Sequence, residues 1–317
     1  MSEKFSVLKR GVYWAAVRAN KKIGERFYRL SLEFPGPGTE AFANVQPGQF
    51  AQLDLSGVTL PPAEMIPQEL ADSAERKILL RRPFSFADVT TKDNKTSVDI
   101  LYCVVGPATL RMTTLSAGDS VSVIGPLGNG FRVAKGKKTA LLVSGGMGAG
   151  PLQHLAKILT ADFPRIDAVA FVGAKSAEEL PFERRLNKIA QHLEFSLPEF
   201  ARYGIRSLVA TDDGSAGFSG LVTDCLSEWL GKRDLAGENT VIYSCGPEAM
   251  LARVAEIAKK KNIDCQVSME RRMACGIGIC QSCAVECKAA GSNETIYKLC
   301  CEDGPVFDGS EVAWSIR

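Results

Sequence analysis

The sequence lacks features that several large classes of protein require. Its 38 basic residues exceed its 36 acidic residues by only two, so the charge balance favours neither nucleic acid nor an anionic membrane as a partner. No run reaches the roughly 18 consecutive apolar residues of a membrane-spanning helix. The only two histidines, His154 and His192, fall in segments with helical spacing. We therefore expect neither to act as an acid or base, and we predict no catalytic side chain.

The N-terminus, MSEKFSVLKRGVYWAAVRAN, also lacks the apolar core and the cleavage site of a secretion signal. We therefore expect a cytoplasmic protein. Thiols stay reduced in the cytoplasm, where clustered cysteines more often bind metal or carry out redox chemistry than form disulfides. Six of the ten cysteines lie close together near the end of the chain, a concentration that chance rarely produces. They are Cys275, Cys280, Cys283, Cys287, Cys300 and Cys301.

The first part of the chain, residues 1–134, is typical of β-structure. Its short apolar or alternating runs are separated by Gly, Pro, Asn and Asp. The runs are VYWAAVRANKKIG, FYRLSLEF, GQFAQLDL, TSVDILYCVV and DSVSVIGPLG. Their regular spacing predicts a barrel or sandwich. The polar, proline-bearing stretch at 56–77 is interpreted as a surface insertion.

After residue 134 the pattern changes to alternating strands and helices, which is typical of a doubly wound parallel sheet. Buried-strand runs such as TALLVSGG and NTVIYSCGP alternate with helical segments such as MGAGPLQHLAKILTADF and FERRLNKIAQHL. We assign this α/β domain to residues 135–262. The remaining segment, 263–317, is rich in Cys and Gly and ends in a pattern typical of a hairpin.

Two glycine-bearing turns follow strands of the α/β domain. The loop SGGMGAGP at 144–151 contains Gly145, Gly146 and Gly148, which let a pyrophosphate approach the backbone at the start of a helix. YSCGPEAM at 243–250 repeats the arrangement with Cys245 and Gly246. Ligands of open α/β sheets bind at the carboxyl ends of the strands, so both turns are candidates for one nucleotide site. The alternatives are a turn needed only for packing and a buried structural cysteine.

The segment RRPFSFAD at 81–88 closes one of the early strands. Arg82 and Ser85 place a phosphate-binding cation and a hydroxyl on one short extended stretch. This pair suits a dinucleotide cofactor that lies along a barrel. The alternative is an arginine that caps a surface strand.

Cys275, Cys280 and Cys283 have the spacing C-x₄-C-x₂-C, with further cysteines downstream. This is the plant-type spacing for a 2Fe–2S cluster, in which a distant cysteine completes the ligand set. The intervening Gly276 and Gly278 let the backbone bend and expose N–H groups to sulfide. Zinc normally takes paired C-x₂₋₄-C knuckles, of which the chain has only one good example. We therefore favour a cluster over zinc or free thiols.

The identity of the fourth ligand is open at this point. Cys287 follows Cys283 too closely to close a loop easily around a cluster. Cys300 and Cys301 both come after a return segment, as the distant ligand should. Adjacent side chains point in different directions, so we expect only one of this pair to reach the cluster.

Taken together, these motifs resemble the ferredoxin–NADP reductase superfamily. More narrowly, the chain resembles the electron-transfer subunits of class 1B dihydroorotate dehydrogenases. The matching segments are RRPFS, ILYCVVGPAT, GPLGNGF, ATDDGSAGFSGLVTD, YSCGPEAM, MERRMACGIGICQSC and CCEDGPVF. The resemblance implies a β-barrel FAD domain, an α/β doubly wound nucleotide-binding domain and a small C-terminal iron–sulfur segment.

The resemblance also implies where the cofactors bind. The family pattern places FAD against Arg82, Pro83, Phe84, Ser85, Leu101, Tyr102, Cys103, Ala108 and Thr109. NAD, the electron acceptor, would meet the flavin between the glycine loop and CGPEAM. The family's fourth cluster cysteine directly precedes EDGP, which corresponds to Cys301 and leaves Cys287 as a bystander.

The chain departs from the family pattern at a few positions. Cys103 stands where we expect a basic residue and Ala108 where we expect a glycine, and Arg111 is a candidate to compensate. The 56–77 insertion is longer than expected. Lys175, after the second strand of the α/β domain, is placed to meet a ribose, the 2′-phosphate of NADP or only solvent, so the sequence does not decide between NAD and NADP.

The function implied by the resemblance is electron transfer to NAD⁺ in pyrimidine biosynthesis. Electrons from dihydroorotate would pass from the FMN of a catalytic partner subunit through the 2Fe–2S cluster to FAD, in a heterotetramer with two copies of each chain. A flavin is required because the cluster carries single electrons while the nicotinamide takes a hydride. One alternative is a reductase subunit of a hydrogenase or ferredoxin-linked complex. Another is a redox-sensing or structural metal module.

Overall fold

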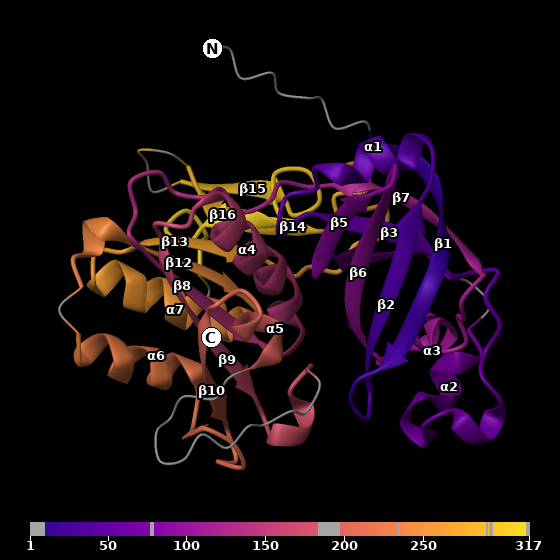
Figure 1. Cartoon of the computed structure of the whole chain (residues 1–317), viewed down its shortest axis with the longest axis horizontal. Coiled ribbons are helices and arrows are strands. Elements are labelled where there is room, and N and C mark those ends of the chain that lie inside the picture. The colour runs from indigo at the N-terminus through magenta and orange to yellow at the C-terminus, as the bar shows by residue number, and fades with distance from the viewer. Residues whose placement is uncertain are drawn as a thin grey trace.

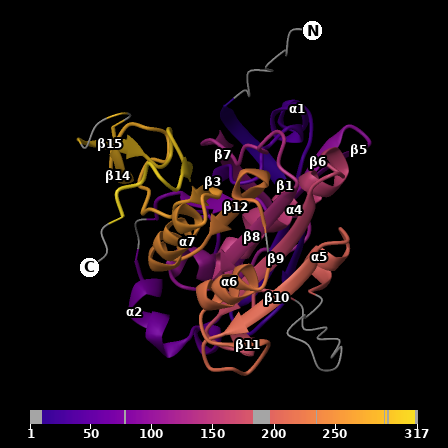
Figure 2. The same cartoon turned by 90° about the vertical axis from the view of Figure 1, so that its left-hand side faces the viewer.

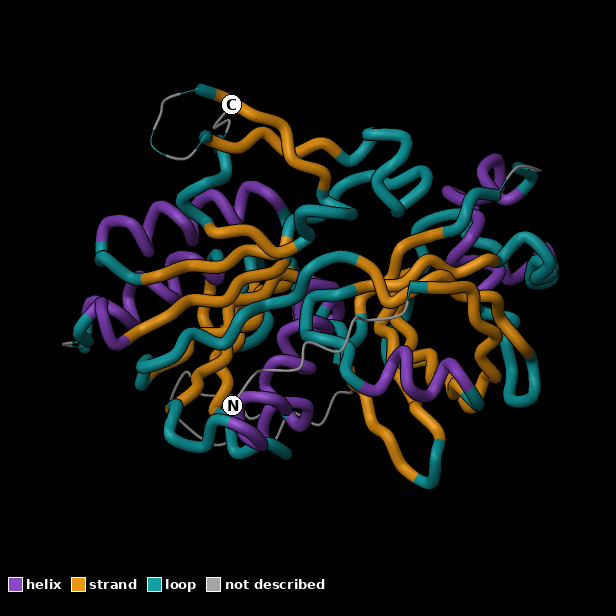
Figure 3. Tube along the Cα trace, turned by 90° about the horizontal axis from the view of Figure 1, so that it is seen from above, coloured by secondary structure: helices purple, strands orange, loops and turns teal. Residues whose placement is uncertain are grey.

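Two seven-stranded sheets lie side by side and are built from successive parts of the chain (Figure 1). The computed structural model describes residues 10–76, 79–182, 197–233, 235–289, 291 and 294–314. Seen from above, the strands form two separate groups, and the C-terminal hairpin lies along one edge (Figure 3). No helix within the described ranges is long and apolar enough to cross a membrane.

The first sheet is antiparallel and has the strand order β4-β3-β7-β1-β2-β6-β5. Its strands are β1 (Gly11–Lys22), β2 (Phe27–Phe34), β3 (Phe50–Asp54), β4 (Arg82–Ser85), β5 (Asp88–Lys92), β6 (Lys95–Cys103) and β7 (Ser120–Leu127). The edge strands β4 and β5 follow one another in the chain, and β4 contacts β6, so the sheet curls round as the predicted barrel. Sequence alternation indicates these strands except β5, whose residues are mostly polar and exposed.

The inner face of this sheet is filled by side chains. On β2, Leu30, Leu32 and Phe34 are fully buried because alternate residues of a strand point to the same face. Two short helices, α1 (Pro37–Ala43) and α3 (Pro107–Met112), add apolar residues to the same core. The ring of Phe42 in α1 stacks on Phe34 with 3.9 Å between ring centroids. A ligand must therefore bind outside this core.

The insertion at 56–77 forms short helices against the barrel. These are η1 (Ala63–Met65), η2 (Gln68–Leu70) and α2 (Ala71–Ala74). Leu70 and Ala74 are buried in the barrel core, and Arg26 of the barrel forms an ion pair with Glu69 at 3.7 Å. The described part of the insertion is thus anchored, although most of its side chains are exposed.

The second sheet has the order β11-β10-β9-β8-β12-β13-β16, parallel except for β16. Its strands are β8 (Thr139–Gly145), β9 (Asp167–Ala174), β10 (Arg206–Thr211), β11 (Phe218–Ser219), β12 (Thr240–Cys245), β13 (Asp264–Ser268) and β16 (Val306–Asp308). Its helices are η3 (Gly146–Gly148), α4 (Ala149–Asp162), η4 (Ala177–Glu179), α5 (Pro198–Ala201), α6 (Val222–Gly231), η5 (Gly237–Asn239) and α7 (Glu248–Lys260). Nearly all of the predicted helix FERRLNKIAQHL, with His192, lies outside the described residues.

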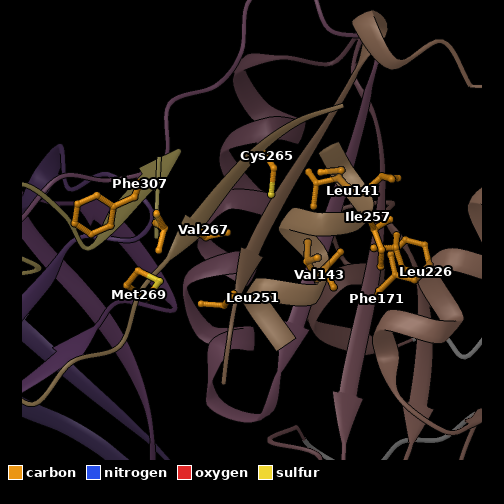
Figure 4. Close-up of a cluster of buried hydrophobic side chains, with 14 of the residues drawn as sticks. Leu141, Val143, Phe171, Leu226, Leu251, Ile257, Cys265, Val267, Met269 and Phe307 are labelled. Carbon is orange, nitrogen blue, oxygen red and sulfur yellow. The ribbon is translucent and has the colours of Figure 1, made fainter. Parts of the chain in front are cut away.

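Helices cover both faces of the parallel sheet, as the alternating pattern predicts. α4 and α5 pack on one face, whereas α6 and α7 pack on the other. On the second face Leu226 and Ile257 of the helices meet Leu141 and Phe171 of the strands (Figure 4). The same cluster continues to Phe307 of β16, so the end of the chain shares a core with the α/β part.

The C-terminal segment is built onto the edge of the second sheet. We drew a boundary at residue 263, but β13 pairs in parallel with β12 and continues the sheet. The hairpin indicated by the sequence is formed by β14 (Ala284–Lys288) and β15 (Thr295–Leu299), which lie together at one side of the molecule (Figure 2). The cysteine-rich loop therefore lies between a strand of the α/β sheet and this hairpin.

The strand order reverses at β8, which lies between β9 and β12. Such a reversal opens a crevice at the carboxyl ends of the strands. Both glycine-bearing turns lie there, because Gly145 ends β8 and Cys245 ends β12. The topology thus brings the two predicted nucleotide-binding turns together.

A lysine on α4 connects the two sheets. The Nζ of Lys157 donates hydrogen bonds to Asp88 Oδ1 (2.6 Å), the Val89 carbonyl (2.6 Å) and Thr90 Oγ1 (2.8 Å), all on β5. The ammonium group is only partly exposed, so solvent weakens these bonds less than it does at the surface.

We expect Lys157→Met to lower the free energy of unfolding by about 1–3 kcal/mol, because the Val89 carbonyl and the Thr90 hydroxyl lose their charged donor while Asp88 keeps only its ion pair with Arg202 at 3.4 Å. Lys232→Met removes an exposed ion pair with Glu228, and should change the free energy of unfolding by less than about 0.5 kcal/mol. Urea unfolding of both variants measures the difference. Equal losses would show that the contact between the sheets contributes no more than a surface pair.

Candidate functional site

A cavity of about 1050 Å³ lies where the barrel, the α/β sheet and the C-terminal segment meet. All fourteen residues predicted to bind FAD or NAD line it. They are Arg82, Pro83, Phe84, Ser85, Leu101, Tyr102, Cys103, Ala108, Thr109, Gly145, Gly146, Gly148, Cys245 and Gly246. The cavity is continuous from the barrel strands to the two glycine-bearing turns, so one pocket contains both predicted sites.

The barrel side of the cavity is formed by β4, β6 and the turn before α3. The hydroxyl of Thr109 accepts hydrogen bonds from the N–H groups of Val105 (2.9 Å) and Gly106 (3.1 Å), and so holds this turn in shape. Burial raises the pKa of the Cys103 thiol, which is therefore protonated at neutral pH. Cys103 supplies no charge to a phosphate.

Arg111, the candidate to compensate for Cys103, lies outside the cavity. Its side chain donates to the Pro107 carbonyl at 3.1 Å. Arg76, at the end of the described part of the insertion, does line it, as do Arg271 and Arg272. The basic side chains around the cavity therefore come from the insertion and the C-terminal segment.

The two glycine-bearing turns touch directly. A Cβ on Gly148 would lie 2.0 Å from the carbonyl oxygen of Cys245, so only glycine fits there. Gly246 has φ +157°, a conformation that side chains disfavour. Burial raises the pKa of the Cys245 thiol to about 12, which keeps it neutral beside the cavity.

The four predicted cluster cysteines lie in two pairs. The Sγ atoms of Cys283 and Cys301 are 3.3 Å apart. The N–H of Cys280 donates to the Sγ of Cys275 at 3.3 Å, and the N–H of Gly278 donates to the Sγ of Cys301 at 3.1 Å. Backbone donors thus face the sulfurs, as the glycine spacing predicts.

This arrangement fits a two-iron cluster, in which each iron takes two protein ligands. Hydrogen bonds from Ser282 lower the pKa of Cys280 to about 6 and favour its thiolate. Burial, and then the neighbouring Cys283, raise the pKa of Cys301 to about 12. The Cys301 thiol therefore needs a nearby cation to ionise, which a metal centre supplies.

Cys287 and Cys300 point elsewhere. Cys287 is fully buried on β14 and packs in the apolar core. The thiol of Cys300 donates to the Met269 carbonyl at 3.3 Å, away from its neighbour Cys301. The structure thus separates two adjacent cysteines that the sequence spacing alone does not distinguish.

A loop between the two sheets holds the return segment that carries Cys301. The side-chain amide of Asn129 donates to the carbonyls of Glu302 and Asp303, both at 3.0 Å, and its backbone N–H donates to Gly304 at 2.6 Å. These bonds join the motif GPLGNGF, which contains Asn129, to the motif CCEDGP, which contains Cys301.

Known proteins resemble this chain along nearly its whole length. Residues 270–313 match the iron–sulfur cluster binding domain of dihydroorotate dehydrogenase B, and residues 142–256 match the oxidoreductase NAD-binding domain. The electron transfer subunit of dihydroorotate dehydrogenase B (NAD(+)) from Caldanaerobacter subterraneus subsp. tengcongensis is 34% identical over 94% of this chain and 97% of its own length. That from Geobacillus kaustophilus is 37% identical over 93% and 96%.

The chain belongs to the family of dihydroorotate dehydrogenase B electron transfer subunits. The family resemblance stated from the motifs is therefore confirmed. The two matched domains account for NAD and the iron–sulfur cluster, and the reductase fold accounts for FAD.

Solved structures agree on the fold. The structure of an NADH-dependent reduced ferredoxin–NADP oxidoreductase has a TM-score of 0.69 at 26% identity, over 95% of this chain and 90% of that one. Phthalate dioxygenase reductase, at 15% identity, has a TM-score of 0.55 over 91% and 77% of the two chains. The expected order of barrel, α/β domain and iron–sulfur segment is thus confirmed.

Several residues at the cavity are absent from the sequence prediction. Phe50 and Gly48 line it from the barrel, and Arg271, Arg272 and Met273 line it from the C-terminal segment. The motif MERRMACG holds the last three directly before the first cluster cysteine, a position that could have indicated their role. No local signal marks Phe50, which reads as an ordinary strand residue.

Of the two histidines, His154 is described and does not line the cavity. It is buried in α4, and this burial lowers its pKa to about 4. His154 is therefore neutral at physiological pH and lies away from the predicted cofactors.

We expect Gly148→Ala to destabilise the protein by about 1–3 kcal/mol and to weaken NADH binding, because its Cβ would overlap the Cys245 carbonyl. The matched control is Gly150→Ala within α4, whose Cβ would meet nothing closer than 3.7 Å. This change should be neutral or stabilising by up to about 1 kcal/mol. Thermal unfolding and NADH titration test both variants. Equal stability of the two would contradict the close-contact argument.

Proposed function

We propose that this chain passes electrons from a dihydroorotate-oxidising FMN subunit to NAD⁺ by way of a 2Fe–2S cluster and FAD. One observation carries the proposal: the cavity that contains the predicted flavin and nicotinamide residues is also lined by 268–273, and Cys275 follows two residues later. The cluster loop thus begins at the wall of the cavity. The names of the relatives, which specify dihydroorotate dehydrogenase B and NAD(+), support the partner and the acceptor.

We assign the ligand roles as follows. Arg82 and Ser85 on β4 would hold FAD, together with Tyr102 of the neighbouring strand β6. Gly145, Gly146 and Gly148, with Cys245 and Gly246, would leave space for the nicotinamide against the flavin. Cys275, Cys280, Cys283 and Cys301 would bind iron, and N–H groups of Gly278 and Cys280 already face their sulfurs.

When bound, the flavin would supply the exchange between single-electron and hydride transfer that the cluster and the nicotinamide cannot make alone. The protein's own task is to position the groups, while the one proton that turns two electrons into a hydride would come from solvent. Cys103 and Cys245 line the cavity as neutral thiols, because burial raises the pKa of both. Neither therefore offers a charged or readily ionised group near the site.

We propose NAD rather than NADP as the acceptor. Lys175 does not line the cavity, and its carbonyl accepts the N–H of Asp213 at 3.1 Å. Asp212 and Asp213 directly follow β10, and this hydrogen bond holds Asp213 next to Lys175. Carboxylates at this edge of the sheet favour a ribose hydroxyl over a 2′-phosphate.

The assembly and the compartment belong to the same proposal. We propose a heterotetramer of two copies of each subunit. We also propose a cytoplasmic location, because cysteines must remain reduced to bind iron. The alternative of a hydrogenase or ferredoxin-linked reductase subunit shares the cofactors, but the relatives that align along nearly the whole chain support the dihydroorotate system.

Co-expression with a dihydroorotate dehydrogenase FMN subunit tests the proposal. We expect a complex that forms orotate with NAD⁺ as the acceptor, and a much lower rate when this chain is omitted. The mass of the complex checks the stoichiometry. A complex that oxidises NADH but makes no orotate would favour the hydrogenase or ferredoxin-linked alternative, and a colourless zinc protein would favour the structural module.

Cysteine substitutions test the ligand set. Cys301→Ser and Cys283→Ser should each abolish or strongly reduce the visible absorbance of the cluster, because each removes a sulfur of the close pair. Cys287→Ser and Cys300→Ser should preserve it, since these thiols face the core and the Met269 carbonyl. Iron and sulfide analysis of the four purified variants provides the measurement. Loss of the cluster in Cys287→Ser or Cys300→Ser would mean that the fourth ligand is misassigned.

A further inference from the structure

Gln52, in the middle of β3, is fully buried, and its side-chain amide has no hydrogen-bond partner among the described residues. Both the nitrogen and the oxygen are unsatisfied. A buried amide without a partner is costly, so natural proteins rarely retain one unless a ligand, water or metal centre satisfies it. The residues around this side chain indicate which kind of group would satisfy it.

The side chain of Gln52 faces the cluster loop. Ala51 and Leu53, its neighbours on β3, point into the barrel core, so Gln52 points to the opposite face. A Cβ on Gly276 would lie 2.0 Å from Nε2 of Gln52. Gly276 directly follows Cys275, and its φ of +67° turns the loop around the amide. The amide thus occupies the place where a side chain of the cluster loop would otherwise lie.

A second buried glutamine shows what the barrel does with a purely structural amide. Gln49 precedes β3, and its Nε2 donates to the Gly128 carbonyl at 2.7 Å. Its Oε1 accepts the N–H of Gln46 at 2.8 Å. The protein supplies every partner that Gln49 needs, whereas it supplies none to Gln52. The two residues therefore differ in function although they are alike in burial.

We propose that Gln52 is a positioning residue of the iron–sulfur centre, whose amide N–H donates to a sulfide of the cluster that the cysteine loop would hold. The inference rests on the proposed function, since it requires a cluster in this loop. Reduction adds negative charge to the sulfurs, and hydrogen bonds to them are one of the factors that set the reduction potential. The donor from Gln52 therefore stabilises the reduced cluster and raises its potential.

The same strand serves both cofactor sites. Phe50, two residues before Gln52 on the same face, lines the cavity. The residue opposite Gln52 on β4 is Pro83, which also lines the cavity. One face of β3 thus borders both the cavity and the cluster loop, and Gln52 contacts the loop from that face. A residue of the barrel thereby sets part of the reduction potential of a cluster bound in the C-terminal segment.

The test compares Gln52→Leu with the matched variant Gln49→Leu in the purified chain loaded with its cofactors. We expect Gln52→Leu to retain the cluster, to shift its midpoint potential to a more negative value, and to leave the FAD potential unchanged. Gln49→Leu should lower thermal stability but leave both potentials as in the unmodified chain. Redox titration followed by electron paramagnetic resonance for the cluster, and by absorbance for FAD, measures these shifts.

A second measurement guards against a purely structural effect. Exchange into D₂O should remove a proton coupling of the reduced cluster in the unmodified chain and in Gln49→Leu, and this coupling should be missing from Gln52→Leu. Gln52→Glu keeps the shape but lacks the N–H donors, so it should also lower the cluster potential. A potential in Gln52→Leu equal to that of the unmodified chain would overturn the inference and leave the proposed function intact. Absence of iron and sulfide from the unmodified chain would instead overturn the proposed function.

Discussion

The three parts of this chain meet around one cavity because glycines let their backbones approach closely. A Cβ on Gly148 would overlap the carbonyl of Cys245, and one on Gly128 would lie 2.6 Å from Pro305. The first contact joins the two nucleotide-binding turns, and the second joins the barrel to the return segment that carries Cys301. Packing at this distance is possible only for glycine, so these positions set the spacing of the cofactor sites.

The order of the sites in space follows the chemistry of the electrons. A nicotinamide site must lie against the flavin because hydride transfer needs contact, whereas an iron–sulfur cluster exchanges single electrons and needs only proximity. The cavity satisfies the first requirement, since barrel strands and glycine-bearing turns line the same space. The cysteine loop satisfies the second, since Gly276 contacts Gln52 on the strand next to β4.

The environments of the cysteines show how one residue type performs different tasks in one chain. Cys103 and Cys245 lie at the cavity and are kept neutral by burial. Cys280 is exposed and its thiolate is favoured by hydrogen bonds from Ser282. Cys300 is buried and its thiol is bound to a backbone carbonyl. Hydrogen-bond partners, rather than burial, distinguish the proposed ligand Cys301 from its neighbour Cys300: both are buried, but Gly278 donates to the sulfur of Cys301.

The sequence by itself determined the two sheets, the two glycine-bearing turns and the cysteine spacing proposed to hold a cluster, because all of these depend on local periodicity or on short spacings. It also carried enough family motifs to predict that FAD binds against β4 and β6. The choice between Cys300 and Cys301 could not be made from spacing alone, since it depends on how a return segment docks on Asn129. Only the tertiary structure brought Phe50, Arg76 and Gln52 to the cofactor sites, because each reads locally as an ordinary strand or surface residue. Their roles arise from which distant segments fold against them, and that information is spread over the whole chain.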